Sequence, residues 1–454
     1  MGDRHPLHYV RMPASAAAAR PRAGAPAPFS ARLLHRSPIP APGRGARTAL
    51  AAAACGLLTA PCVAFAQSDG PLDPAANAPA GGTGLAQQAI ARAAQRHSLY
   101  QEVDDLYGTY SRFKTAFQKD TGLQWSVDGT VMQQTGNPDG GRPAPSVLGQ
   151  VSLDWNAFTS PVIGSGSVQF LGFYNGYFTQ HSVADMQSSL GVVTPPNAWP
   201  DTQNQFAQFT YTQTLPGGAL ALAGGQYPIF NFDTNQYLGN SQLNFVNYVL
   251  AQNGSAAYAD AGLGGFVQWN ASGTLQFAAG AQDPNNASFN HLRSIDQAGT
   301  AWFGYLQWTP SFRALGRAQY SLTWYDSPGQ QGTGAHGWSV NAVQNLGAAW
   351  AVFGRANGAS GNTGAIEASY AVGVALNDPL HRSATDQIGV AVGLSRPAGY
   401  TGADNDETVV EAYWNWTFLR GLLLAPDLQY IGNPALNPAH NSVWVLSLRA
   451  TVMF

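Results

Sequence analysis

The chain has 454 residues, a formal net charge of −3 and only 10% charged residues, together with 51 glycines and 11% aromatic residues. Soluble globular domains carry about 25% charged residues, so this composition argues against an ordinary globular enzyme. The sequence also lacks an uninterrupted apolar run of about 20 residues, which argues against a protein that crosses a membrane with helices.

Residues 1–66 have the features of a leader with a signal peptide. Arg44 and Arg47 precede an alanine-rich apolar stretch, and the triplet that ends at Ala66 matches the small-residue pattern of a cleavage site. We therefore expect cleavage after Ala66. The basic segment before Arg44 favours a start codon placed too far upstream over an organellar transit peptide.

Removal of the leader changes the charge and the cysteine content. It leaves 14 Lys and Arg against 24 Asp and Glu, a net charge of −10. An acidic chain without a basic stripe predicts no nucleic-acid partner, and it disfavours a pore built for anions. Cys55 and Cys62, the chain's two cysteines, both fall in the leader, so we expect no disulfide in the mature chain.

The next segments predict a linker and then a helix. Residues 67–84 are rich in Pro, Ala and Gly and are expected to be a disordered linker. Residues 85–118 are expected to be helical, because apolar residues such as Leu106 and Phe113 recur at heptad spacing. Such a helix would pack on, or plug, the periplasmic mouth of a barrel; a short coiled coil is the alternative interpretation.

From residue 120 to residue 454 the apolar period changes to two. Apolar and polar residues alternate in runs of about ten between turn signals, and short and long connections alternate between the runs. The sixteen candidate strands are 122–134, 147–158, 164–178, 204–214, 219–227, 262–270, 274–283, 300–309, 313–326, 337–347, 348–358, 364–377, 384–396, 407–418, 422–432 and 442–454. This pattern predicts an all-β protein, a transmembrane antiparallel β-barrel of about sixteen strands with a short N-terminal helical segment. The last run ends on Phe454, as expected where the final strand closes the barrel on the first.

The candidate functional residues are polar side chains on the wet face of the strands. No nucleophile, metal-ligand or phosphate-binding motif appears, so we expect no enzyme, no metal and no cofactor. The channel-lining and substrate-binding candidates are Asp128, Asp154, Arg313, Arg317, Arg355, Glu411, Asp427 and Gln429. A lining with donors, acceptors and both signs of charge suits an uncharged solute with many hydroxyls.

The long segment 228–261 is the candidate constriction, because a long loop without regular structure is often functional. Folded inwards it would narrow the pore; the alternative is an external loop. Its candidate residues are Asp233, Asn235, Tyr237, Phe245 and Asn247.

Two stretches resemble a known family, the carbohydrate-selective porins of the OprB type. The first is the string PDLQYI from Pro426, with Asn433-Pro434 and then a final L-x-LR strand ending in Phe454. The second and looser one is Gly224-Gly225-Gln226. The resemblance implies a sixteen-stranded, sugar-permeable porin. The family often has a basic residue where this chain has Gln226, which leaves the preferred sugar open.

These observations lead to three functional hypotheses. The first is a porin of the Gram-negative outer membrane that lets carbohydrates pass by passive, facilitated diffusion. The second is a general or cation-preferring porin, which the acidic mature chain favours. The third is a barrel enzyme. The expected partners are sugars and outer-membrane lipid, with a homotrimer by analogy to other porins.

Overall fold

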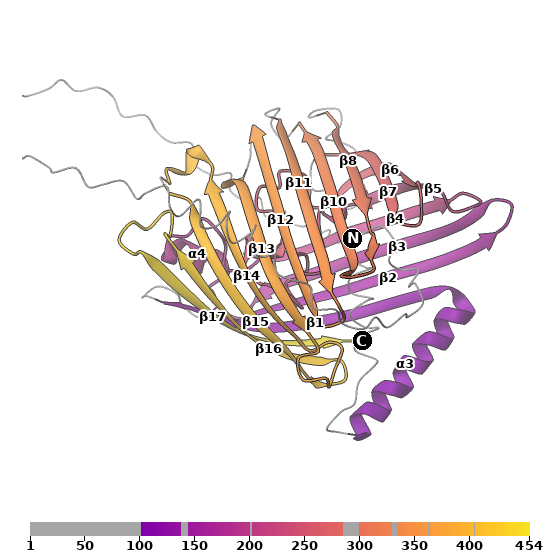
Figure 1. The fold of residues 1–454 in the computed structure, drawn as a ribbon, viewed down its shortest axis with the longest axis horizontal. Coiled ribbons are helices and arrows are strands. Elements are labelled where there is room, and N and C mark those ends of the chain that lie inside the picture. The colour runs from indigo at the N-terminus through magenta and orange to yellow at the C-terminus, as the bar shows by residue number, and fades with distance from the viewer. Residues whose placement is uncertain are drawn as a thin grey trace, which may run out of the picture. The chain divides into compact units, whose positions relative to one another are not determined.

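The computed structural model describes residues 101–137, 144–199, 202–284, 299–328, 334–361, 364–403 and 405–454. Their strands form one antiparallel sheet that closes on itself (Figure 1). The closing pair is β1 (Leu123–Asn137) with β17 (Ser442–Met453), whose register runs from Asp128 opposite Met453 to Asn137 opposite Trp444. Because β1 also pairs with β2, no strand edge remains at this seam.

Sixteen membrane-spanning strands make up this barrel, as the sequence predicted. The structure assigns seventeen segments, but the two residues of β9 continue β8 beyond Thr309 and Pro310, and both pair with β10. The strands between β1 and β17 are β2 (Ser146–Ser160), β3 (Gly164–Tyr177), β4 (Gln203–Thr214), β5 (Leu220–Tyr227), β6 (Gly262–Asn270), β7 (Leu275–Gln282), β8 (Ala301–Trp308), β9 (Ser311–Phe312), β10 (Gly316–Ser327), β11 (Ala335–Leu346), β12 (Trp350–Gly361), β13 (Ile366–Asn377), β14 (Gln387–Pro397), β15 (Glu407–Leu419) and β16 (Leu422–Gly432).

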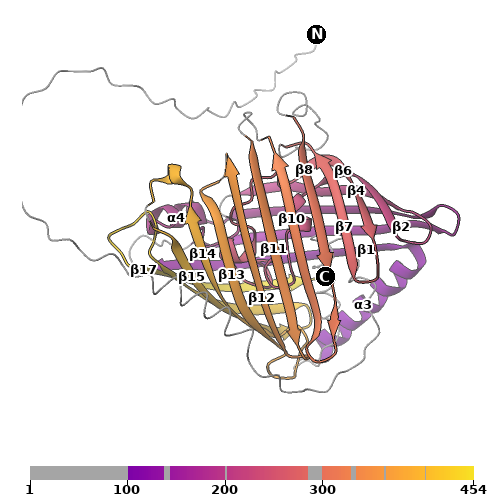
Figure 2. The same ribbon diagram turned by 45° about the horizontal axis from the view of Figure 1, so that its top comes forward.

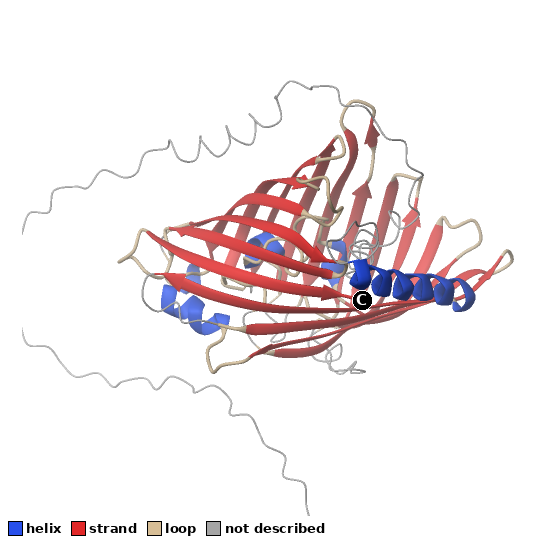
Figure 3. Cartoon of the chain, turned by 90° about the horizontal axis from the view of Figure 1, so that it is seen from below, coloured by secondary structure: helices blue, strands red, loops and turns tan. Residues whose placement is uncertain are grey.

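Few helices accompany the strands (Figure 3). In the part of the chain that the structure describes they are α3 (Gln101–Thr121), α4 (Val183–Leu190), α5 (Tyr248–Ala251) and the 3-10 turns η2 (Ile229–Phe232) and η3 (Gly399–Thr401). Within the described residues no helix is long and apolar enough to cross a membrane. α3 is the predicted N-terminal helical segment and continues three residues past the expected end at 118. The predicted leader 1–66, the linker 67–84 and the helical residues 85–100 lie outside the described residues.

The alternation of the sequence becomes the two faces of the barrel wall. On β17, Leu446 and Leu448 are more than half exposed, whereas the alternate residues Ser447 and Arg449 are buried. β10 repeats this arrangement with Trp324 outside and Thr323 inside. An apolar outer face and a polar inner face are what a barrel in lipid requires. The outer face therefore contacts lipid, and the inner face contacts water or the loops that enter the lumen.

The two ends of the barrel differ in their connections. Tight turns such as Arg420-Gly421 gather at one end, while the long segments that follow β3 and β5 leave from the other. By the usual orientation of outer-membrane barrels, the end with short turns faces the periplasm. The C-terminus and α3 lie at this end (Figures 1 and 2).

Candidate functional site

The long segment 228–261, called the constriction loop from here on, lies inside the barrel against the inner face of β10 to β16. Its Asn235 amide donates to Asn341 Oδ1 on β11 at 3.0 Å. Its Asn244 amide donates to Gln387 Oε1 on β14 at 3.0 Å. Wall side chains also donate to its backbone, as Thr323 does to the Phe232 carbonyl. The loop is thus hydrogen-bonded to the wall over many strands, and further hydrogen bonds join it to β1, β4 and β17.

Glu411 on β15 binds the N-terminal end of α5, the one-turn helix in the constriction loop. Its two carboxylate oxygens accept the backbone N–H groups of Val246 at 2.5 Å and Asn247 at 2.9 Å. Asn247 is also the N-cap residue of α5, since its side chain accepts from the Val249 N–H. A carboxylate at this position satisfies donors that a helix start leaves unpaired.

Arg355 on β12 binds the other end of α5. Its Nη1 donates to the Leu238 carbonyl at 2.9 Å, and its Nη2 donates to the carbonyls of Val249 at 3.0 Å and Gln252 at 2.5 Å. A guanidinium at the C-terminal end and a carboxylate at the N-terminal end both complement the partial charges of a helix. Two wall residues of opposite charge therefore hold one helical turn at both ends.

A second segment, 178–199, enters the lumen beside the constriction loop. Glu407 on β15 accepts the N–H groups of Val193 at 2.9 Å and Thr194 at 2.8 Å. Trp199 donates from its indole N–H to Ser241 Oγ in the constriction loop at 2.9 Å. The two infolded segments are therefore hydrogen-bonded to each other as well as to the wall.

The five candidate residues of the constriction loop are all buried between the loop and the wall. Tyr237 stacks on Phe353 at 4.9 Å between ring centroids, and Phe245 meets Tyr413 edge-on at 4.8 Å. Asp233 accepts from the Asn253 amide at 2.6 Å. Burial raises the pKa of Asp233, and Arg355 opposes this shift. These residues face the wall, and none of them lines the cavity beside the loop.

The eight wall candidates lie at different levels of the barrel. Arg355, Glu411 and Gln429 contact the constriction loop, Gln429 through the Asn247 amide at 3.1 Å. Three acidic candidates also lie on the wall strands. Asp128 and Asp427 are buried, and Asp154 is partly exposed.

Arg313 and Arg317 are exposed at the end with short turns. The predicted strand 313–326 begins too early, because the residues after Phe312 form the turn into β10, which starts at Gly316. Arg313 therefore lies in that turn. The candidates do not form one cluster.

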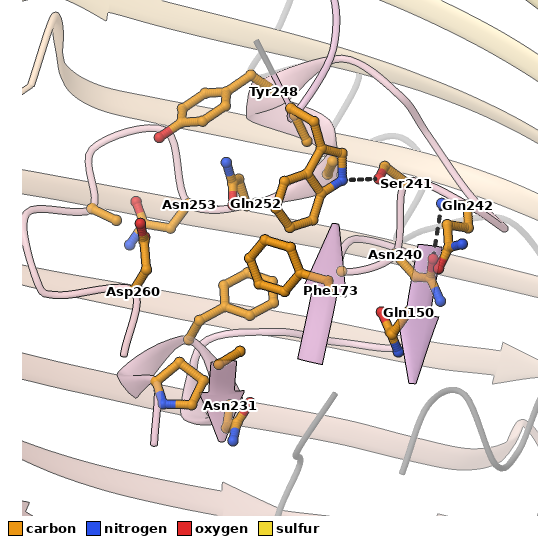
Figure 4. Close-up of a pocket in the computed structure, with 18 of the residues that line it drawn as sticks. Gln150, Phe173, Asn231, Asn240, Ser241, Gln242, Tyr248, Gln252, Asn253 and Asp260 are labelled. Carbon is orange, nitrogen blue, oxygen red and sulfur yellow. Dashed lines mark hydrogen bonds between the residues drawn. The ribbon is translucent and has the colours of Figure 1, made fainter. Parts of the chain in front are cut away.

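A cavity of about 350 Å³ lies between the constriction loop and the inner face of β2 to β4. The wall contributes Gln150 and Phe173, and the constriction loop contributes Tyr248 and Asp260 among others (Figure 4). Segment 178–199 contributes Trp199. The predicted constriction segment 228–261 supplies most of this lining, whereas sequence reasoning missed the part that comes from β2 to β4 and from segment 178–199. Trp199 lies in a long connection, and the alternation of apolar and polar residues does not predict where such a connection lies.

Gln226, where the family often has a basic residue, lies on β5 and is buried. Its amide donates to the Phe206 carbonyl of β4 at 2.5 Å. The preceding Gly225 has φ +135°, and a Cβ there would lie 2.1 Å from the Phe209 carbonyl oxygen. The Gly-Gly-Gln motif therefore marks a close approach of β5 to β4.

Comparison with known proteins decides the family. The sequence model of the "Carbohydrate-selective porin, OprB family" matches residues 309–454. Porin AaxA of Chlamydia felis (strain Fe/C-56) is 31% identical over 357 residues, which cover 75% of this chain and 80% of that protein. The chain belongs to the OprB family of porins. Porin AaxA of Chlamydia abortus (strain DSM 27085 / S26/3) is 29% identical and is covered to 79%.

The fold of this OprB-family porin agrees with a solved relative. The high-pH structure of Pseudomonas putida OprB matches with a TM-score of 0.59 at 14% identity, covering 75% of this chain and 96% of that one. At this identity the likeness concerns the fold, a closed barrel of sixteen strands. Family and fold together make the protein an outer-membrane porin.

Proposed function

We propose that this porin lets uncharged carbohydrates cross the outer membrane by passive, facilitated diffusion through the cavity beside the constriction loop. The chemistry of the lining carries the proposal. Aromatic rings of Phe173, Trp199 and Tyr248 stand with the amides of Gln150 and Asn240 around one space. Rings can cover the C–H faces of a sugar, and amides can replace the water on its hydroxyls.

The distribution of charge supports an uncharged solute. Among the lining residues that the structure describes, Asp260 is the one carboxylate, and none is Lys or Arg. The charged wall residues Arg355 and Glu411 are occupied by the backbone of the constriction loop. A solute in the passage therefore meets dipoles and rings rather than an array of ions. Binding by such groups is weak enough to permit release, which conduction requires.

Single-channel recording in planar bilayers tests this proposal. Addition of a neutral hexose is expected to reduce the ion current in a concentration-dependent way, because the sugar occupies the passage. The carboxylate form of the same sugar, at equal concentration, is the matched control and is expected to reduce the current less. Full ion conductance that neither compound changes would refute the sugar proposal.

A general or cation-preferring porin is the second candidate, and Asp260 together with the acidic mature chain favours it. The reversal potential in a salt gradient distinguishes the two. A strong cation preference that falls in Asp260→Asn, without any effect of sugars, would support this second function. A small preference with clear sugar effects would support the first.

The remaining expectations are also proposals. We infer no enzymatic function; hydrolysis that is lost on replacing a single Ser or His would restore the enzyme hypothesis. Export through the periplasm and a homotrimeric assembly are further proposals, which fractionation of cell envelopes and chemical crosslinking would test. The eight wall candidates keep their proposed role of controlling solute passage, three of them through contacts with the constriction loop.

A further inference from the structure

The helix α3 follows the rim of the barrel rather than crossing its mouth. Near its start, the Tyr107 hydroxyl donates to the Met453 carbonyl at 3.4 Å, and a few residues later the Tyr110 ring meets Phe454 at 6.3 Å. At its end, the Trp155 indole donates to the Thr121 carbonyl at 3.1 Å. These contacts lie in turn on β17 and β2, with β1 between them, so the helix runs along neighbouring strands at the periplasmic end.

The aromatic side chains of the wall that α3 touches belong to the outer face of the barrel, whereas Tyr107 near the start of the helix is buried. Trp155 and Phe454 are 45% and 47% exposed, and Trp125 shares its face of β1 with the exposed Val127. The rings of Phe113 and Phe117 contact Trp125 at 6.2 and 5.3 Å between centroids. The C-terminal half of α3 therefore packs on the outside of the rim, beside the surface that faces lipid.

One flank of α3 stays apolar and more than half exposed, although Phe113 also contacts Trp125. Leu106 is 73% exposed and Phe113 is 55% exposed, although both lie on the stripe that includes Tyr110 and Phe117. Residues seven positions apart lie on one face of a helix. Thr115 lies on the opposite face, since nine residues from Leu106 amount to two and a half turns. The apolar flank is thus continuous with the aromatic outer rim.

We propose that α3 is a membrane-interface helix, which lies in the headgroup region of the periplasmic leaflet with Leu106 and Phe113 in contact with phospholipid. Three observations carry this assignment: the helix follows the rim, it packs against the outer face, and its exposed apolar side adjoins the lipid-facing residues. The helix carries exposed residues of both charges, Arg112 and Lys119 as well as Asp105 and Asp120, so its apolar flank rather than a net charge carries the contact with lipid. The helix thereby fixes the depth of the periplasmic rim in the membrane.

Site-directed fluorescence tests the proposal. Single cysteines replace Leu106, Phe113 or Thr115 in a parent in which Cys55 and Cys62 are serine, and each variant is labelled with an environment-sensitive dye. The proteins are reconstituted in vesicles that contain lipids with a headgroup nitroxide. We expect blue-shifted emission and strong nitroxide quenching at 106 and 113, with protection from aqueous iodide. We expect the reverse at 115.

Two results would overturn the proposal. Labels at 106 and 113 that iodide quenches as strongly as the label at 115 would place this flank in water. Labels shielded from both quenchers, together with a disulfide between chains when unlabelled Leu106→Cys is treated with a mild thiol oxidant, would show that a second copy of the chain covers the flank. Because neither readout depends on the transported solute, failure here is distinct from failure of the sugar proposal.

Discussion

Replacement of Glu411 by glutamine is expected to loosen the constriction loop and to widen the pore for part of the time. The fully buried carboxylate accepts two backbone N–H groups of the loop, from Val246 and Asn247. Glutamine keeps one acceptor and turns a donor toward the other N–H. Loss of one charge-assisted bond and an unsatisfied buried donor cost about 2 to 4 kcal/mol. That corresponds to roughly a hundredfold shift in the equilibrium between the attached and the detached segment.

Single-channel recording is the assay for this change. Glu411→Gln should show brief steps to higher conductance and greater open-channel noise, because Arg355 still holds the other end of α5. Faster entry of a disaccharide into proteoliposomes should accompany these steps. Glu367→Gln, the same change at a partly exposed glutamate of β13, is the matched control. If both Glu411→Gln and Glu411→Ala fold and conduct like the parent, the carboxylate does not position the loop.

Three further predictions test other parts of the account. Gly225→Ala should lower the stability of the barrel by about 2 kcal/mol or more, because a Cβ at φ +135° would lie 2.1 Å from a carbonyl oxygen. Gly224→Ala is the control, since a Cβ at residue 224 has room and should leave the stability unchanged. Urea denaturation measures both variants, and equal midpoints would contradict the prediction. Trp199→Ala should weaken sugar block of the current roughly fivefold, since one aromatic contact contributes about 1 kcal/mol; unchanged block would remove Trp199 from the solute path. Burial lowers the pKa of Lys114. Docking of α3 should therefore strengthen as pH rises toward the usual pKa of 10.5, and the fluorescence of the labelled helix measures this docking. Lys114→Met should abolish the pH dependence of docking, and an unchanged pH dependence in the variant would refute the prediction.

The strands could be predicted from the sequence because their signal is local. β6 (Gly262–Asn270) and β16 (Leu422–Gly432) have the bounds that alternation gave. The period of two also fixes which face of the barrel wall a residue joins, so the sequence alone places Glu411 on the inner face. Where the signal weakened, near Arg313, the predicted strand began three residues early, since alternation does not distinguish a strand end from a polar turn.

The contacts of the candidate site could not be predicted in the same way. Val246 and Glu411 are 165 residues apart, and no periodicity records which wall strand an infolded loop touches. The composition of segment 228–261 indicated a constriction, but it did not indicate that its charged partners in the wall bind backbone groups. Trp199 came from a second segment whose entry into the lumen depends on Glu407 and Ser241, contacts that only the fold brings about.

Swelling of proteoliposomes in isosmotic solutes tests the central claim most directly. The comparison sets a neutral hexose against the sugar acid of the same carbon number, so that size is matched and charge is not. The account predicts that the hexose enters several-fold faster, because the passage offers rings and amides and no basic side chain among its described lining residues. Equal entry of both solutes, or ion conductance without any sugar entry, would contradict it.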